Sequence, residues 1–180
     1  FNAARFSQLA ARSAVIGEIG LDSTARTPLP IQLHVLRQML EILCDLPRII
    51  SIHSYLATGL VLEELRKKPV STPVLHWWTG SEGETKQAVE MGCYFSIHPS
   101  IARQAKFRSC VPLERILFES DQGWEDAPAS IPLRIAQAEE RLARQWELSA
   151  EDMRLQRWRN FAALVQKTAT TPLLPTALVE

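Results

Sequence analysis

The chain has 180 residues, of which 46% are hydrophobic and 22% are charged, and its formal net charge is +0. It has no apolar run long enough to span a bilayer and no excess of positive charge that would indicate a polyanionic partner. The composition therefore predicts a soluble globular chain with a single domain over residues 1–180. The three cysteines lack metal-type spacing and indicate structural thiols in a reducing, cytoplasmic compartment. Because the sequence starts at Phe1 without a signal peptide, we expect a fragment or a processed product.

Apolar runs alternate with amphipathic segments through the first half of the chain. Strand-like runs rich in β-branched residues are separated by stretches with apolar residues at helical spacing, and prolines punctuate the connections. The predicted elements are a helix over Phe1–Ala11, a strand over Ala14–Asp22, a helix over Ile31–Leu46, a strand over Arg48–Tyr55 and a helix over Thr58–Lys68. This order is typical of right-handed βαβ units and a parallel sheet.

The alternation continues in the second half. The predicted elements are a strand over Pro73–Gly80, a helix starting near Ser81, a strand over Gly92–Ser100, a helix over Ile101–Phe107, a strand over Arg115–Asp121, and helices over Leu133–Glu147 and Ala150–Lys167. Residues 168–180 show no convincing pattern, so we expect a loose tail there.

Four of the predicted strands carry a side chain that can bind a metal near their carboxyl ends. These residues are Glu18, His53, His76 and Asp121. Because strand ends converge on one face of a parallel α/β barrel, we expect the four side chains to lie close together. Glu18 falls in an apolar run that predicts a buried strand, where an ionised carboxylate would need a cation, a metal or a raised pKa. Backbone N–H groups or an arginine could also satisfy it.

Four motifs in this order, IGEIGLD, IHS, LHWWTG and ERILFESD, resemble those of the TatD family of metal-dependent deoxyribonucleases, which are (β/α)8 barrels. The resemblance implies an α/β fold of TIM type and two divalent metal ions, Mg²⁺, Mn²⁺ or Zn²⁺. It further implies that Glu18 bridges the two ions and that His53 and His76 bind the second. Asp121 would bind the first ion and orient or deprotonate the attacking water, so Glu18 and Asp121 are the implied catalytic residues.

The sequence departs from the family pattern in two places. The first strand of the family carries an acidic residue followed by His-x-His, and this sequence contains no His-x-His. A complete barrel takes ~250 residues, so we expect a partial barrel that lacks the first two strand–helix units. After Asp121 the family has a small residue and then proline, whereas this chain has Gln122, Gly123 and Trp124.

Three further residues are candidates for substrate binding. His98, at a strand end before a proline, could contact substrate or phosphate. Trp77 and Trp78 follow a proposed ligand, and strand alternation would send one inward and one toward the helices. Packing is the default role for both tryptophans, with nucleobase stacking as the alternative. Arg103 begins a basic run that could contact DNA phosphates or form a solvated helix face.

Other polar residues near these motifs have more ordinary interpretations. We expect Glu119 to hydrogen-bond a neighbouring group instead of binding metal. Lys106 and Arg108 continue the basic run that begins at Arg103. The later arginines, Arg154, Arg157 and Arg159, are expected to form an ordinary charged helix surface.

Three functions remain open at this point. The resemblance favours a metal-dependent hydrolase of phosphodiester bonds with DNA as its substrate, and with exonuclease character. The same barrel and ligands could instead serve a hydrolase of small amides or esters. The absence of His-x-His allows a third possibility, an inactive fragment or a binding scaffold.

Overall fold

A computed structural model describes residues 1–122 and 130–178 of the chain. It divides into two compact units, the first made of Phe1–Leu75 with Ala163–Glu180 and the second of His76–Ala162. Within the described residues, no helix is long and apolar enough to cross a membrane.

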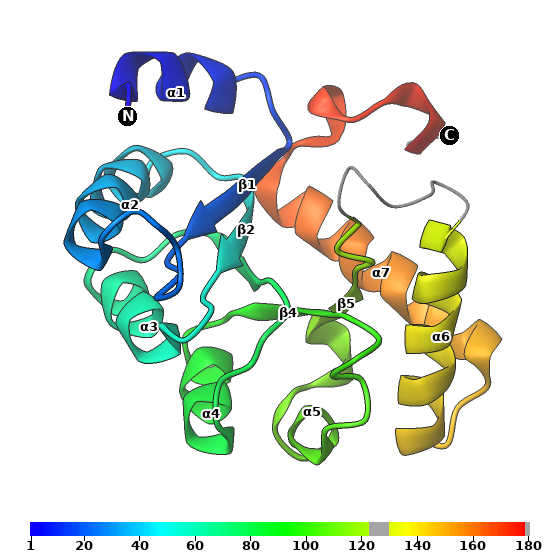
Figure 1. Cartoon of the computed structure of the whole chain (residues 1–180). Coiled ribbons are helices and arrows are strands. Elements are labelled where there is room, and N and C mark those ends of the chain that lie inside the picture. The colour runs from blue at the N-terminus through cyan, green and yellow to red at the C-terminus, as the bar shows by residue number, and fades with distance from the viewer. Residues whose placement is uncertain (123–129, 179–180) are drawn as a thin grey trace. The chain divides into compact units, whose positions relative to one another are not determined.

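The first unit is a parallel sheet with helices between its strands (Figure 1). It contains α1 (Ala3–Ala10), β1 (Val15–Gly20), α2 (Leu29–Leu43), β2 (Ile49–His53), α3 (Thr58–Lys67) and β3 (Thr72–Leu75). All three strands are parallel, with β2 between the other two, and Ile49 pairs with Val15 on one side and Thr72 on the other. The predicted strands and helices are present, with shifted ends.

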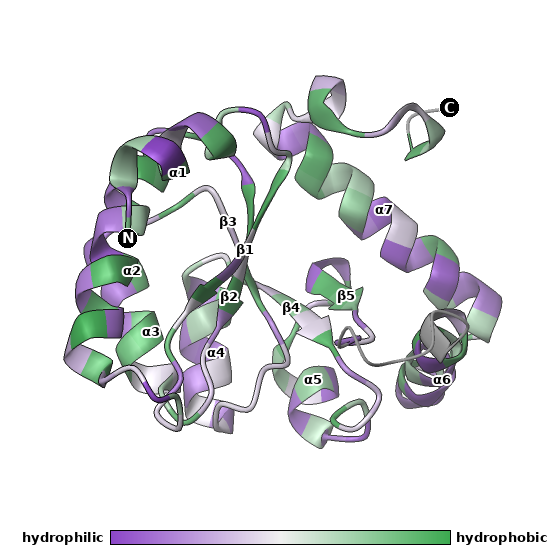
Figure 2. Ribbon diagram, turned by 45° about the horizontal axis from the view of Figure 1, so that its top comes forward, coloured by the Kyte–Doolittle hydropathy of each residue, from purple (hydrophilic) through white to green (hydrophobic). Residues whose placement is uncertain are grey.

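Three leucines at helical spacing form the buried face of α2. Leu36, Leu40 and Leu43 recur at intervals of four and three residues and are buried, while polar residues occupy other positions of the helix (Figure 2). In β2, Ile50 and Ile52 are fully buried. The core of this unit is therefore formed by aliphatic side chains on the strands and on the inner faces of the helices.

A nearly buried arginine ties α1 to the sheet. The guanidinium of Arg48 donates hydrogen bonds to the carbonyl oxygens of Ala10 and Ala11, at 3.0 Å each. The hydroxyl of Thr72 in β3 donates to the Arg48 carbonyl. These bonds satisfy polar groups where the chain leaves α1 and enters the sheet.

The second unit continues the strand–helix alternation. It contains α4 (Glu82–Glu90), β4 (Tyr94–Ile97), α5 (Ala105–Cys110), a 3-10 turn η1 (Leu113–Arg115), β5 (Ile116–Phe118), α6 (Ser130–Gln145) and the start of α7 (Ala150–Thr168). β4 and β5 pair in parallel, with Phe95 opposite Ile116 and Ile97 opposite Phe118. A capping box between Ser81 and Glu84 begins α4, close to the predicted start.

A buried carboxylate joins α6 to α7. Glu139 is 1% exposed, and its oxygens lie 3.2 Å from Arg154 Nε and 2.9 Å from Arg157 Nη1. Arg157 is only 20% exposed, so the prediction of an ordinary charged surface is wrong for it, because a carboxylate buried between helices needs cations beside it. Arg154 is exposed as predicted, but its contact with Glu139 was not predicted. Arg159 is exposed, as predicted.

The limits of β3, α5 and the carboxyl-terminal tail differ from those predicted for the following reasons. β3 ends at Leu75, before the two tryptophans, because the chain turns there and Trp77 has a φ of 38°. α5 begins at Ala105, since residues 101–103 form turns. The tail contains two 3-10 turns, η2 (Thr171–Leu173) and η3 (Thr176–Leu178), and Thr170 is fully buried.

The three cysteines, Cys44, Cys93 and Cys110, are free. Cys93 is fully buried, and burial raises the pKa of its thiol to about 12. A thiol that stays protonated is a poor nucleophile and a poor metal ligand. Cys93 therefore has the structural role expected from the sequence.

Candidate active site

The first unit brings Glu18, His53 and Asp22 together at the carboxyl ends of β1 and β2. We call these residues the β1–β2 cluster. His53 Nδ1 lies 3.4 Å from Glu18 Oε2, and His53 Nε2 lies 3.5 Å from Asp22 Oδ2. One imidazole thus lies between two carboxylates, an arrangement of oxygen and nitrogen atoms that suits a divalent cation.

Gly20 allows the two strands to meet closely at this cluster. It pairs with His53 in the sheet and has a φ of +148°. A Cβ atom at this position would lie 2.0 Å from the His53 carbonyl oxygen. Both the backbone conformation and the close approach therefore require glycine.

The expectation that Glu18 is buried is wrong. Its side chain is 42% exposed, and Val15 at the start of β1 is 47% exposed. The pairing register of β1 shifts between Ile16 and Ile19, and only these two residues of the strand are buried. Desolvation therefore gives no reason for a cation at Glu18, and the case for one rests on the approach of His53.

The sequence did not identify Asp22 as a neighbour of His53. Its carboxylate accepts hydrogen bonds from the hydroxyl of Thr24 at 2.6 Å and from the Thr24 backbone N–H at 2.7 Å. These bonds hold the pKa of Asp22 below its ordinary value. A carboxylate two residues after a strand end is a signal that could have found it.

The second unit contains another cluster, formed by His76, Glu119 and Asp121, which we call the His76 cluster. His76 Nδ1 lies 2.6 Å from Glu119 Oε2, and His76 Nε2 lies 3.6 Å from Asp121 Oδ1. The other oxygen of Glu119 accepts a hydrogen bond from the backbone N–H of Trp77 at 2.8 Å. Glu119 thus hydrogen-bonds its neighbours, as the sequence suggested.

This geometry sets the tautomer of His76. An ionised carboxylate only accepts hydrogen bonds, so Nδ1 carries a proton, and in the neutral imidazole Nε2 carries the lone pair. The imidazole is 8% exposed and held in one orientation, with its Nε2 atom on the side of Asp121. A histidine that donates one N–H to a carboxylate is typical of metal sites in proteins.

The two tryptophans after His76 have different environments. Trp78 is fully buried, and its indole N–H donates to the Thr85 hydroxyl at 2.8 Å. Trp77 is partly exposed and stacks on His98, with ring centroids 4.0 Å apart and an interplanar angle of 22°. Because both tryptophans lie beyond the end of β3, the strand alternation used to predict their directions does not apply.

His98 lies beside the His76 cluster. Burial lowers the pKa of its imidazole below the ordinary value, and the charges of Glu119 and Asp121 oppose that shift. Its Nδ1 atom lies 2.8 Å from the Ser100 hydroxyl. Trp77 and His98 therefore form an aromatic surface beside the carboxylates of this unit.

The basic run after β4 does not act as one solvated face. Lys106 donates to the Gly80 carbonyl, and Arg108 donates to the Gln145 carbonyl at 3.0 Å. Arg103 is exposed. Gly123 and Trp124, where the sequence departs from the expected proline pattern, lie outside the described residues.

Comparison with known proteins places these clusters in context. Residues 2–166 match the family described as TatD related DNase. The chain is 30% identical over 167 residues to TATDN3 of Mus musculus, and 29% identical over 143 residues to tatdn3-B of Xenopus laevis. Both relatives carry the name putative deoxyribonuclease. The alignments cover 87% and 77% of this chain, and they span 57% and 51% of those relatives.

Solved structures confirm the predicted fold class. YjjV, a TatD homologue from Escherichia coli K12, superposes with a TM-score of 0.76 at 22% identity, over 90% of this chain and 69% of its own. An uncharacterized amidohydrolase from Saccharomyces cerevisiae gives a TM-score of 0.72 at 14% identity, over 90% of this chain and 70% of its own. The fold is thus α/β and corresponds to part of a TIM-type barrel, and the chain belongs to the TatD related DNase family.

Proposed function

We propose that this protein is a metal-dependent hydrolase that cleaves phosphodiester bonds of DNA. The observation that carries the proposal is the pair of carboxylate–imidazole clusters that follow strand ends, Glu18 with His53 and His76 with Asp121. Membership of a family described as TatD related DNase supports DNA as the substrate. The chain spans about half the length of the curated relatives that it matches, so their activity is proposed for it here.

The donor set fits divalent metal ions. Carboxylate oxygens and imidazole nitrogens suit Mg²⁺, Mn²⁺ or Zn²⁺, and the bond from His76 to Glu119 orients that imidazole as in known metal sites. Each histidine directly follows a buried strand residue, Ile52 or Leu75. We propose that Glu18, His53, His76 and Asp121 bind two such ions.

The bound ions would activate a water molecule and neutralise charge on the phosphate. Asp121 is 41% exposed, and we assign it the role of accepting a proton from that water. Glu119 holds the His76 imidazole in one tautomer. Trp77 and His98 offer a flat surface on which a nucleobase can stack.

The test is degradation of single-stranded DNA with and without Mn²⁺ or Mg²⁺. We expect cleavage to require the metal, and Asp121→Asn to reduce it by about 100-fold or more because the proton acceptor is lost. Glu114→Gln, at an exposed carboxylate outside both clusters, is the matched control. Cleavage that persists in Asp121→Asn would remove that residue from the mechanism. Hydrolysis of small esters or amides with DNA untouched would overturn the choice of substrate.

The exonuclease character rests on resemblance and needs its own measurement. DNA labelled at one end should release single nucleotides from the first time point if cleavage starts at a terminus. A ladder of intermediate lengths from a circular strand would instead show internal cleavage. The same assay carried out on RNA would show whether cleavage requires deoxyribose or also accepts ribose.

A further inference from the structure

We propose that a pocket lined by Arg103, Arg141, Arg144 and Gln145 binds a backbone phosphate of the nucleic acid strand whose cleavage was proposed above. We call it the arginine pocket. The inference rests on the proposed function and adds to it a second contact for the strand, away from the His76 cluster. The ligand chemistry is a phosphate group, and we assign its source to a phosphodiester of the same strand other than the cleaved one.

The arginine pocket lies between the loop after β4 and the carboxyl-terminal half of α6, and its volume is about 230 Å³. That volume exceeds the space of several water molecules, at about 30 Å³ each. It can therefore admit a phosphate group with part of its hydration shell. All of its lining residues belong to the second unit.

Hydrogen bonds fix the frame of the pocket. Arg141 donates to the Pro99 carbonyl, and Gln145 donates to the Ala102 carbonyl, so α6 is tied to the loop at both ends of residues 99–102. Arg108 lies nearby and donates to the Gln145 carbonyl. The pocket is thus part of the packed structure of this unit, and its shape does not depend on the exposed side chains alone.

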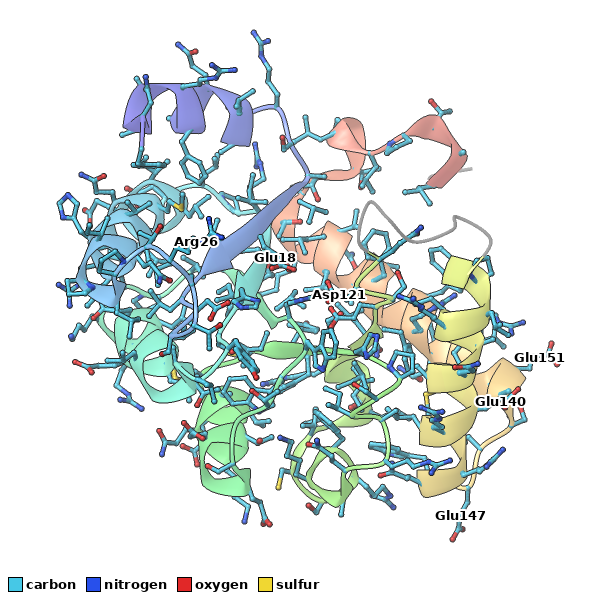
Figure 3. The ribbon with its side chains drawn as sticks, viewed as in Figure 1. Glu18, Arg26, Asp121, Glu140, Glu147 and Glu151 are labelled. Atoms are coloured by element: carbon cyan, nitrogen blue, oxygen red, sulfur yellow. The ribbon has the colours of Figure 1, made fainter. Side chains whose placement is uncertain are left out.

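Two of the arginines are available for a ligand. Arg103 and Arg144 are both exposed. Arg144 lies 3.9 Å from the Glu140 carboxylate, and both side chains are mostly in solvent, so exchanging this contact for another costs little. Glu140 projects outward from α6 (Figure 3).

The charge of the pocket favours phosphate. The whole chain has a formal net charge of +0, yet three guanidinium groups line this one pocket. Guanidinium groups are planar forks that bind phosphate oxygens through paired hydrogen bonds. Such contacts read charge and geometry rather than base sequence, as expected for a nuclease that accepts many sequences.

One short loop links the arginine pocket to the proposed site. The loop begins at His98, which stacks on Trp77 beside the His76 cluster, and it reaches Arg103 five residues later. A chain of that length spans at most ~18 Å. At 3.4 Å or more per nucleotide, a strand covers this distance in about five nucleotides or fewer. The arginine pocket is therefore within reach of a short oligonucleotide that starts at the His76 cluster.

The proposed phosphate contact gives the test. Binding of a fluorescent single-stranded 12-mer is measured on the full chain in EDTA, where metal-dependent cleavage does not occur. We expect Arg103→Gln combined with Arg144→Gln to weaken 12-mer binding by about tenfold. The slope of the logarithm of the 12-mer association constant against the logarithm of salt concentration should also fall in magnitude by about one. Arg159→Gln, an exposed arginine on α7, is the matched control.

The outcomes separate this inference from the proposed function. Unchanged 12-mer affinity and salt dependence in the double variant would refute phosphate binding by the arginine pocket, whether or not the chain cleaves DNA. If the double variant loses binding of inorganic phosphate but binds the 12-mer as tightly as the unaltered chain, the phosphate of the pocket does not come from the strand. A chain that binds the 12-mer through the arginines but cleaves no DNA with metal would refute the hydrolase and leave the pocket standing.

Discussion

At the scale of single residues, Glu119 controls how His76 can act. Its carboxylate accepts from His76 Nδ1 at 2.6 Å and therefore leaves Nε2 as the ligand atom. We predict that Glu119→Gln weakens Mn²⁺ affinity by about 10–100-fold, because an amide can present its N–H₂ group and no longer fixes the tautomer. Isothermal titration calorimetry measures the change, with Glu114→Gln as control. Equal affinity in Glu119→Gln would show that this bond does not orient a metal ligand.

A second residue-scale prediction concerns acid stability. Glu64 is buried, and its carboxylate accepts two hydrogen bonds from the Arg37 guanidinium, which lowers its pKa from 4.5 to about 2. Because the folded-state pKa is depressed, the stabilisation is present above the unfolded pKa and is lost as the pH falls from about 4.5 toward 2. Its size is at most about 3 kcal/mol, and solvent screening of the half-exposed Arg37 reduces it.

Urea unfolding at several pH values tests this interaction. We expect Glu64→Gln to be less stable than the unaltered chain at pH 6, and the difference should shrink as the pH approaches 2. Glu63→Gln is the control, because Glu63 is about half exposed and pairs only with Lys67 among the ion pairs described. A difference that stays constant with pH would mean that Glu64 contributes through packing and not through its charge.

The sequence identified residues of the two clusters better than it identified their surroundings. His53, His76 and Asp121 could be found because a polar side chain that closes an apolar run is visible locally. The partner of His76 lies 43 residues away, so its distance and orientation depend on how the strands are placed. The burial of Glu18 was predicted wrongly for a similar reason, since the register shift within β1 has no sequence signal.

At the scale of elements, two glycines near α4 should respond in opposite ways to alanine. Gly83 lies within the first turn of α4, and a Cβ there would meet nothing within 4 Å. We predict that Gly83→Ala stabilises the chain by about 0.4–1 kcal/mol, because it restricts the unfolded chain without a steric clash. A Cβ on Gly80 would lie 2.1 Å from the ring of Trp78, which is fully buried, so Gly80→Ala should cost about 1–3 kcal/mol.

Chemical denaturation measures the free energy of unfolding of both variants and tests these predictions. Each serves as the control for the other, because they lie three residues apart and make the same chemical change. A destabilised Gly83→Ala variant would contradict the open space at the start of α4. A neutral Gly80→Ala variant would mean that the Trp78 ring can move.

Element order could be predicted and element contacts could not. The alternation of apolar runs and amphipathic segments gave all five strands and the helices between them, because periodicity is local. The pairing of Glu139 with Arg154 and Arg157 was missed, since these arginines look like any charged helix surface in sequence. Only the packing of α6 on α7 shows that the carboxylate is buried.

At the scale of the whole molecule, the fold class was predictable because four motifs occur in the order of a known family. The structural neighbours confirm the α/β fold at identities of 22% or less, where the fold is shared more than the sequence. The same neighbours cannot assign a substrate, since one barrel supports many reactions. The function therefore depends on what the two clusters bind.

The most direct test of the metal-dependent account is thermal melting with and without Mn²⁺. At 100 times the dissociation constant, a ligand of the folded state adds about 2.7 kcal/mol, which corresponds to a shift on the order of 5–10 °C for a chain of this size. We predict such a shift for the unaltered chain and for Glu114→Gln, and its loss in Glu18→Ala. A melting temperature of the unaltered chain that does not change with Mn²⁺, or a Glu18→Ala variant that keeps the full shift, would contradict the account.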